Sequence, residues 1–176
     1  MTPPDPHSAA VPYWAETLRG HPPALELPAS TARSQEQTYT ARDQMLSLDS
    51  ELVEDLQALA ADQGASVQEV LLAGVFALLR RTCGQNDVVL GLARPAGVVP
   101  LRLDLAGNPT CAVLVERVRA GLAGIESAGP ASLDEILSSV GAASPGALFP
   151  VLVVLQAGAP IPDSCKIGRA SCRERV

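Results

Sequence analysis

Residues 65–92 read Ala-Ser-Val-Gln-Glu-Val-Leu-Leu-Ala-Gly-Val-Phe-Ala-Leu-Leu-Arg-Arg-Thr-Cys-Gly-Gln-Asn-Asp-Val-Val-Leu-Gly-Leu, and this stretch predicts a helix followed by a strand. Ser66 and Glu69 have the spacing of a capping box, which fixes the start of the helix. From Val70 to Leu79 no residue is charged or strongly polar, so we predict a core helix that is covered nearly all round. Gly84 then predicts a left-handed stop.

Two strands are predicted after this helix. Val88–Leu92 is an unbroken apolar run, which is typical of a strand covered on both faces. After the connection Arg94–Gly97, apolar residues at 99, 101, 103 and 105 alternate with Pro100, Arg102 and Asp104, the period of a half-buried strand. Because the connection is so short, the second strand must be an antiparallel neighbour of the first.

Further elements complete an α/β pattern. We predict strands at 38–48 and 148–156, the second of them buried. We also predict four further helices: at 11–20, from Asp49 or Ser50 to Gln63, from Asn108 to the break at 129–130, and at 132–139. In this interpretation Asn108 and Pro109 are the N-cap and the first-turn residue of their helix. The predicted fold is α/β, with helices packed on a mixed sheet of about four strands.

Composition and charge exclude several classes of protein. The chain has 176 residues, enough for one domain or a part of one, and 47% of them are hydrophobic. Its formal charge of -6 leaves no basic patch for phosphate backbones or anionic lipids, so we expect neither nucleic acid nor a membrane as a partner. The N-terminus has no apolar run of the kind found in a signal peptide, which favours a cytoplasmic location.

The cysteines and glycines do not form a recognisable catalytic or metal site. Cys83 and Cys111 fall within helical patterns, where we predict small core residues, and with Cys165 and Cys172 they form no close pair of metal-ligand spacing. The chain has no Gly-x-Ser-x-Gly and no phosphate-binding glycine loop with lysine. We therefore assign no catalytic, cofactor-binding or metal-ligating residue.

The order of the segments resembles the C-terminal half of the condensation domains of nonribosomal peptide synthetases. The resemblance covers about Val11 to Gln156. It is carried by the sequence at 13–23 with Leu-Glu-Leu-Pro at 25–28, the helix and Gly-Gln-Asn-Asp-Val-Val-Leu-Gly within 65–92, Pro-Leu-Arg-Leu-Asp-Leu at 100–105, the helix after Pro109, and 144–156. The resemblance implies one lobe of the two-lobe chloramphenicol acetyltransferase-like fold. As a lone lobe it would expose the apolar surface that its partner half should cover.

The resemblance also implies a reaction. The family joins a carrier-bound acyl donor to the amine of a carrier-bound aminoacyl acceptor, both linked through phosphopantetheine, and a His-His-x-x-x-Asp-Gly motif in the N-terminal half supports the chemistry. This chain has no such motif: His7 and His21 lie apart in proline-rich segments, and neither is followed by Asp-Gly at the required spacing. We interpret both as surface residues. The implied partners are the missing N-terminal half and the carrier and adenylation domains of the same synthetase.

Three hypotheses follow. The chain is a fragment of a condensation domain, not catalytic alone; or a degenerate, noncatalytic docking module of a synthetase; or half of an acyl-CoA-dependent acyltransferase. The family's Gly-x-Phe-Val-Asn-Thr motif is missing before residue 99, and little of its His/Asn-Gln-Asp-x-Pro-Phe-Glu motif remains at 128–132. The missing Phe-Val-Asn-Thr segment favours the docking module.

The ends of the chain are treated separately. Residues 1–10 contain three prolines and no periodicity, so we predict a disordered lead-in. The resemblance implies that residues 11–157 form an incomplete C-terminal condensation subdomain, and we predict that 158–176 form a tail. We interpret 167–176, Ile-Gly-Arg-Ala-Ser-Cys-Arg-Glu-Arg-Val, as the in-frame translation of a sequencing adapter, which favours the fragment hypothesis.

Overall fold

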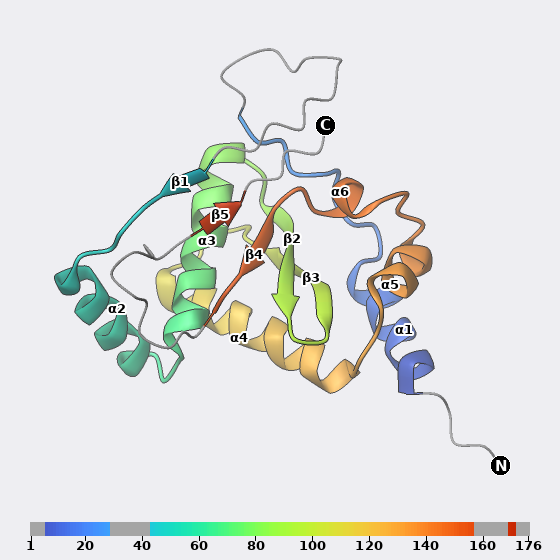
Figure 1. The fold of residues 1–176 in the computed structure, drawn as a ribbon, viewed down its shortest axis with the longest axis horizontal. Coiled ribbons are helices and arrows are strands. Elements are labelled where there is room, and N and C mark those ends of the chain that lie inside the picture. The colour runs from blue at the N-terminus through green and yellow to red at the C-terminus, as the bar shows by residue number, and fades with distance from the viewer. Residues whose placement is uncertain (1–5, 29–42, 157–168, 172–176) are drawn as a thin grey trace.

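A mixed three-stranded sheet with helices on both faces forms the centre of the molecule (Figure 1). The computed structural model describes residues 6–28, 43–156 and 169–171. The helices are α1 (Pro6–Thr17), α2 (Ser50–Asp62), α3 (Val67–Cys83), α4 (Cys111–Ala128), α5 (Leu133–Val140) and α6 (Pro145–Leu148). The strands are β1 (Asp43–Met45), β2 (Asp87–Arg94), β3 (Gly97–Asp104), β4 (Leu152–Val154) and β5 (Arg169–Ser171).

Strand β2 is the middle strand of the sheet, in the order β3-β2-β4. It pairs antiparallel with β3 across the two-residue turn at 95–96, as the short connection predicts, and parallel with β4. Of the predicted strand at 38–48, residues 38–42 lie outside the described residues, and residues 43–48 do not join this sheet. Only residues 43–45 of it are a strand in the described part of the chain, and that strand pairs with β5. Its sequence, Asp-Gln-Met, has no apolar alternation to bury.

The two faces of β2 are covered by different helices. Val88, Leu90 and Leu92 share one face, and in the register of the hairpin they lie opposite Leu103, Leu101 and Val99. Helices α3 and α4 pack on this side, where α3 contacts β2 and α4 contacts β3. The other face carries Arg102 and is covered by α1 and α5, which lie side by side in Figure 1 and contact each other.

Most local start and stop signals are confirmed. Both predicted capping boxes form: each serine accepts a hydrogen bond from the amide of a glutamate three residues on, and the glutamate carboxylate accepts from the serine amide. Asp49 caps α2 by accepting from the amide of Leu52, at 2.8 Å. Gly84 ends α3 in the left-handed conformation, with φ 71°.

Two predicted helix starts are wrong. Helix α1 begins at Pro6, inside the stretch predicted as a disordered lead-in, because Ala10 packs in the core one turn before Trp14. Residues 1–5 of that lead-in lie outside the described residues. Helix α4 is capped by Thr110, whose hydroxyl accepts from the amide of Val113, and not by Asn108. Asn108 is instead held in a left-handed conformation, with φ 52°.

Three predictions of burial are also wrong. Cys111 is exposed because it lies at the very start of α4, although Cys83 is half-buried against the core. Helix α3 is not covered all round, since Leu78 is 60% exposed. Strand β4 lies at the edge of the sheet and is not buried: Leu152 is 47% and Val154 is 53% exposed. Apolar sequence alone therefore overestimates how much of this chain is covered.

The close approach of Phe149 to β2 requires glycine at position 91. A Cβ atom on Gly91 would lie 2.5 Å from Cε2 and 2.6 Å from Cδ2 of the Phe149 ring, which is itself buried.

We expect Gly91→Ala to lower the free energy of unfolding by about 1–3 kcal/mol, because the ring must leave its position. Urea unfolding measures the change. The matched control is Gly74→Ala on exposed α3 surface, where a Cβ meets no atom within 4 Å, and it should raise stability by about 0.5–1 kcal/mol. Equal effects of the two substitutions would contradict this account.

Candidate functional site

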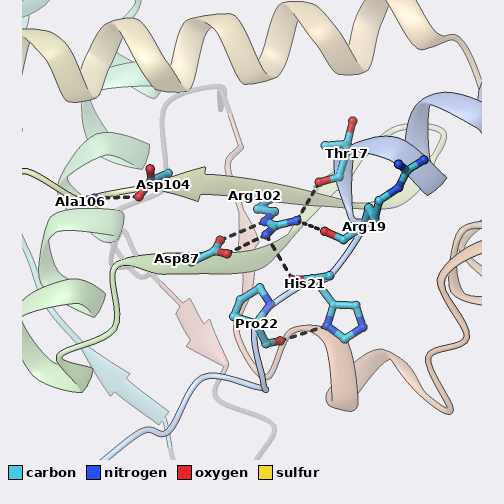
Figure 2. A network of polar contacts seen from close by, with 9 residues as sticks. Thr17, Arg19, His21, Pro22, Asp87, Arg102, Asp104 and Ala106 are labelled. Atoms are coloured by element: carbon cyan, nitrogen blue, oxygen red, sulfur yellow. Dashed lines mark hydrogen bonds and ion pairs between the residues drawn. The ribbon is translucent and has the colours of Figure 1, made fainter.

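Arg102 is the centre of the most extensive polar network in the described residues (Figure 2). Its side chain projects from β3, beside the start of β2. Nε donates to Oδ1 of Asp87 at 3.0 Å, and Nη2 donates to Oδ2 of the same carboxylate at 2.7 Å. This two-point geometry is the strong form of an arginine–carboxylate pair. The side chain of Arg102 is 21% exposed and that of Asp87 is 36% exposed, so water screens this pair partly.

The same guanidinium binds the carbonyl end of α1. Nη1 donates to the carbonyl oxygens of Thr17 at 3.0 Å and of Arg19 at 2.9 Å, and Nη2 lies 3.5 Å from the carbonyl oxygen of Gly20. Carbonyl groups at a helix end lack partners within the helix, and a cation suits them electrostatically. The hydrogen bonds to Asp87 raise the pKa of Arg102, so the guanidinium stays charged. Arg102 therefore fastens the segment at 13–23 to the segment at 100–105.

The two histidines are placed apart by α1. His7 lies at the start of this helix, and His21 follows its end. The His21 ring is half-buried, and its Nδ1 lies 3.0 Å from the carbonyl oxygen of Pro22, beside the Arg102 network (Figure 2). This geometry uses Nδ1 as a donor to the backbone. No nucleophilic or acidic side chain among the described residues is hydrogen-bonded to the His21 ring.

One cavity lies at the end of the sheet where α3 finishes. Its volume is about 480 Å³, and its polar lining comes from Arg80, Arg81, Asn86 and Asn108. Nε of Arg80 donates to Oδ1 of Asn86 at 3.0 Å, and Nη1 donates to Oδ1 of Asn108 at 2.8 Å. The remaining lining residues are Ala77, Gly84, Leu105, Pro109 and Leu114.

A second cavity, of about 410 Å³, lies at the opposite end, by the start of α3 and the end of β2. Its charged groups are paired with one another. Nη2 of Arg94 lies 3.0 Å from Oε1 of Glu126, and Nε of Arg119 lies 3.6 Å from Oε1 of Glu69. The hydrogen bond from the Ser66 amide lowers the pKa of Glu69, although burial opposes this effect. The cavity is therefore electrostatically balanced by its own side chains.

The described residues contain no cluster of three metal-ligating side chains and no helix that is both long enough and apolar enough to cross a membrane.

Two arginine clamps were not identified from the sequence. The Arg102 clamp is the set of hydrogen bonds from Arg102 to Asp87 and the end of α1, and the Arg80 clamp is the pair of hydrogen bonds from Arg80 to Asn86 and Asn108. The signal for one of them was available: a two-residue turn at 95–96 fixes the register of the hairpin and brings Asp87 diagonally beside Arg102. The Arg80 clamp joins three separate segments and leaves no such pattern.

A family model described as the condensation domain matches residues 7–94, which is half of the chain. The chain belongs to the condensation-domain family. The fold agrees: helices on a mixed sheet are also the structure of the X-domain from teicoplanin biosynthesis, with a TM-score of 0.76 at 20% identity over 85% of this chain and 37% of that one. The first condensation domain of the CDA synthetase gives a TM-score of 0.66 at 23% identity, over 82% of this chain and 34% of that one.

Curated relatives of this partial condensation domain are much longer proteins. Phosphinothricin tripeptide synthetase PhsB of Streptomyces viridochromogenes is 32% identical over 61% of this chain and 10% of its own length. Malpibaldin synthetase of Mortierella alpina is 31% identical over 61% of this chain and 2% of its own length. The chain thus spans a tenth or less of these relatives, and about a third of the solved domains.

The Arg102 clamp predicts a large difference between two arginine substitutions. We expect Arg102→Gln to lower the free energy of unfolding by about 2 kcal/mol or more, because Asp87 and the carbonyl groups of α1 all lose their partner. The control Arg19→Gln removes a pair whose side chains are 75% and 69% exposed, and it should cost less than about 1 kcal/mol. Amide hydrogen exchange should also become faster in α1 of Arg102→Gln alone. Unchanged exchange in α1 would rule out the fastening role.

The capping box of α3 predicts a pH dependence. Because folding lowers the pKa of Glu69, its carboxylate stabilises the fold above the unfolded-state pKa, near the ordinary value of 4.5, and this stabilisation is lost as the pH falls through the lower, folded-state pKa. We expect the stability difference between the wild-type chain and Glu69→Gln to be largest near neutral pH and to shrink in acid. Urea unfolding between about pH 3 and pH 7 measures it. A difference that does not change with pH would show that Glu69 acts without its charge.

Proposed function

We propose that this chain forms the C-terminal half of a condensation domain in a nonribosomal peptide synthetase. The observation that carries the proposal is the family match over residues 7–94, together with a likeness in fold to solved domains that extends over more than four fifths of the chain. In the proposed reaction the amine of an aminoacyl acceptor attacks the thioester carbonyl of an acyl donor. The amide bond forms, the thiolate leaves, and the amine gives up a proton.

The proposed role of this chain in that reaction is positioning. Among the described residues, neither His21 nor either arginine clamp presents a general base to a free surface, so the base would come from the His-His-x-x-x-Asp-Gly motif of the other half. Donor and acceptor would both be carried on phosphopantetheine, which this half does not itself hold. Carrier and adenylation domains of the same synthetase would be the partners. A solved relative of this fold is a four-domain nonribosomal peptide synthetase bound to AMP and glycine.

Exposed apolar side chains support a missing partner half. Leu78 on α3 and both Leu152 and Val154 on β4 are about half exposed or more, and Leu46 before α2 is 71% exposed. Water contact with each such side chain costs free energy that a packed neighbour would recover. The missing N-terminal half is the occupant that the proposal assigns to such surface.

A noncatalytic docking module is the second candidate. The observation that favours it is the likeness in fold to the teicoplanin X-domain, which was also solved as a complex with OxyB, with a TM-score of 0.74 at 20% identity. The absent Gly-x-Phe-Val-Asn-Thr motif supports the same candidate. In this role the chain would present a folded surface to another protein and perform no chemistry.

The native locus discriminates between the two candidates. We expect a sequencing read through it to open upstream, in frame, into a half with His-His-x-x-x-Asp-Gly and adjacent carrier and adenylation domains. The encoded protein should form an amide from acyl- and aminoacyl-loaded carrier domains, and substitution of the second motif histidine by alanine should reduce the rate by about 100-fold or more. An upstream half without these histidines, and no amide product, would overturn the catalytic proposal in favour of the docking module.

A further inference from the structure

The cavity at the end of α3 is built from three segments that the chain brings together. Arg80 and Arg81 come from the last turn of α3, Asn86 precedes β2, and Asn108 follows β3. The accessible apolar part of its wall comes from Ala77 and Pro109, and Leu105 and Leu114 are buried beneath it. A volume of about 480 Å³ lies within the range of small-molecule sites, and an apolar wall with a few convergent polar groups is their usual composition.

Arg80 is held in place without being neutralised. Its two hydrogen bonds, at 3.0 and 2.8 Å, go to the side-chain oxygens of Asn86 and Asn108, which carry no net charge. Asn108 adopts φ 52°, a conformation that costs a non-glycine residue free energy and that asparagine tolerates better than most residues. The clamp therefore orients the guanidinium fork while its positive charge stays available.

Charge pairing elsewhere makes this cavity unusual. In the described part of the chain, Arg19, Arg94, Arg102 and Arg119 each have a carboxylate partner, whereas Arg80, Arg81 and Arg117 have none. Of these three arginines, Arg80 and Arg81 line the same cavity. The second cavity carries two arginines and two glutamates in pairs. Two arginines without a carboxylate partner line one cavity, and their local positive charge attracts an anion against the overall formal charge of -6.

We propose that this cavity binds the phosphate group of a small organic phosphate monoester. Two cations match the charge of a phosphate monoester, about -1.5 to -2 at neutral pH, better than they match the single charge of a carboxylate. Side chains of consecutive helix residues leave the helix in different directions. Because a tetrahedral phosphate offers oxygens in several directions, it can accept from two guanidinium groups that approach from different sides. Arg80 and Arg81 are the phosphate ligands, and Asn86 and Asn108 are positioning residues. The organic group lies against Ala77 and Pro109, above the buried Leu105 and Leu114.

Titration of the full chain with phenyl phosphate, followed by NMR of the leucine methyl groups, tests this site. We expect saturable shifts at Leu105 and Leu114, with smaller shifts at Leu101, and a dissociation constant in the millimolar range. Binding should weaken as the pH falls below about 6, where the phosphate takes up its second proton, and as salt screens the charges. Benzyl alcohol, which has the ring without the phosphate, should produce no saturable shift.

Three variants separate the site from a general effect of charge. Arg80→Gln and Arg81→Gln should each weaken binding by about tenfold, and Arg81 is exposed, so its replacement leaves the fold intact. Asn108→Gly removes one arm of the clamp while suiting the left-handed backbone, and it should also weaken binding. Arg94→Gln changes the net charge equally at the other cavity and should leave binding unchanged. Absence of saturable binding, or equal weakening by Arg94→Gln, would overturn the proposal.

Discussion

Strand β2 carries apolar side chains on both faces, and each face needs its own layer of helices. On one side this need is met by α3 and α4, and on the other by α1 and α5, so segments from both ends of the described chain must return to one strand. A strand with one wet face would require only one of these layers. The order of the layers, and the position of every cavity and clamp around them, follows from this requirement.

The second layer creates an electrostatic problem that Arg102 solves. Helix α1 ends over the sheet, and the carbonyl groups at and just after its end need partners that the helix itself does not supply. A strand residue with a long cationic side chain reaches them, and Asp87 on the neighbouring strand holds that side chain in one orientation. One arginine thus joins two neighbouring strands to a helix end, at Thr17, that lies 85 residues before it in the chain.

Local chemistry explains what the sequence predicts well. The capping serines, the left-handed stop at Gly84 and the hairpin all depend on residues within a few positions of one another, and all are found. Whether an apolar strand is buried by other segments cannot be predicted in the same way. Leu152 and Val154 form part of a run that is as apolar as β2, yet they lie at an edge, and only the position of other segments decides this.

The arginine clamps likewise depend on contacts between segments that are distant in the sequence. Asn108 has the sequence of an N-cap, because asparagine before proline usually starts a helix, but its side chain is engaged by Arg80 from α3, and Thr110 takes over the capping. A tertiary contact therefore changes the use of a local signal. The candidate cavity around Arg80 could not have been assembled from the sequence, since its lining comes from three segments with no shared motif.

The two sides of β2 differ in the length of chain that their pairing must close. The hairpin with β3 closes across a two-residue turn, whereas Gly91 pairs with Leu152, 61 residues further along. Closing the longer loop costs more chain entropy before any contact repays it, so we expect the hairpin to form early in folding and β4 to join late. By the same reasoning β4 is among the first elements to detach. We therefore expect the folded state to open most readily at the β4 edge of the sheet.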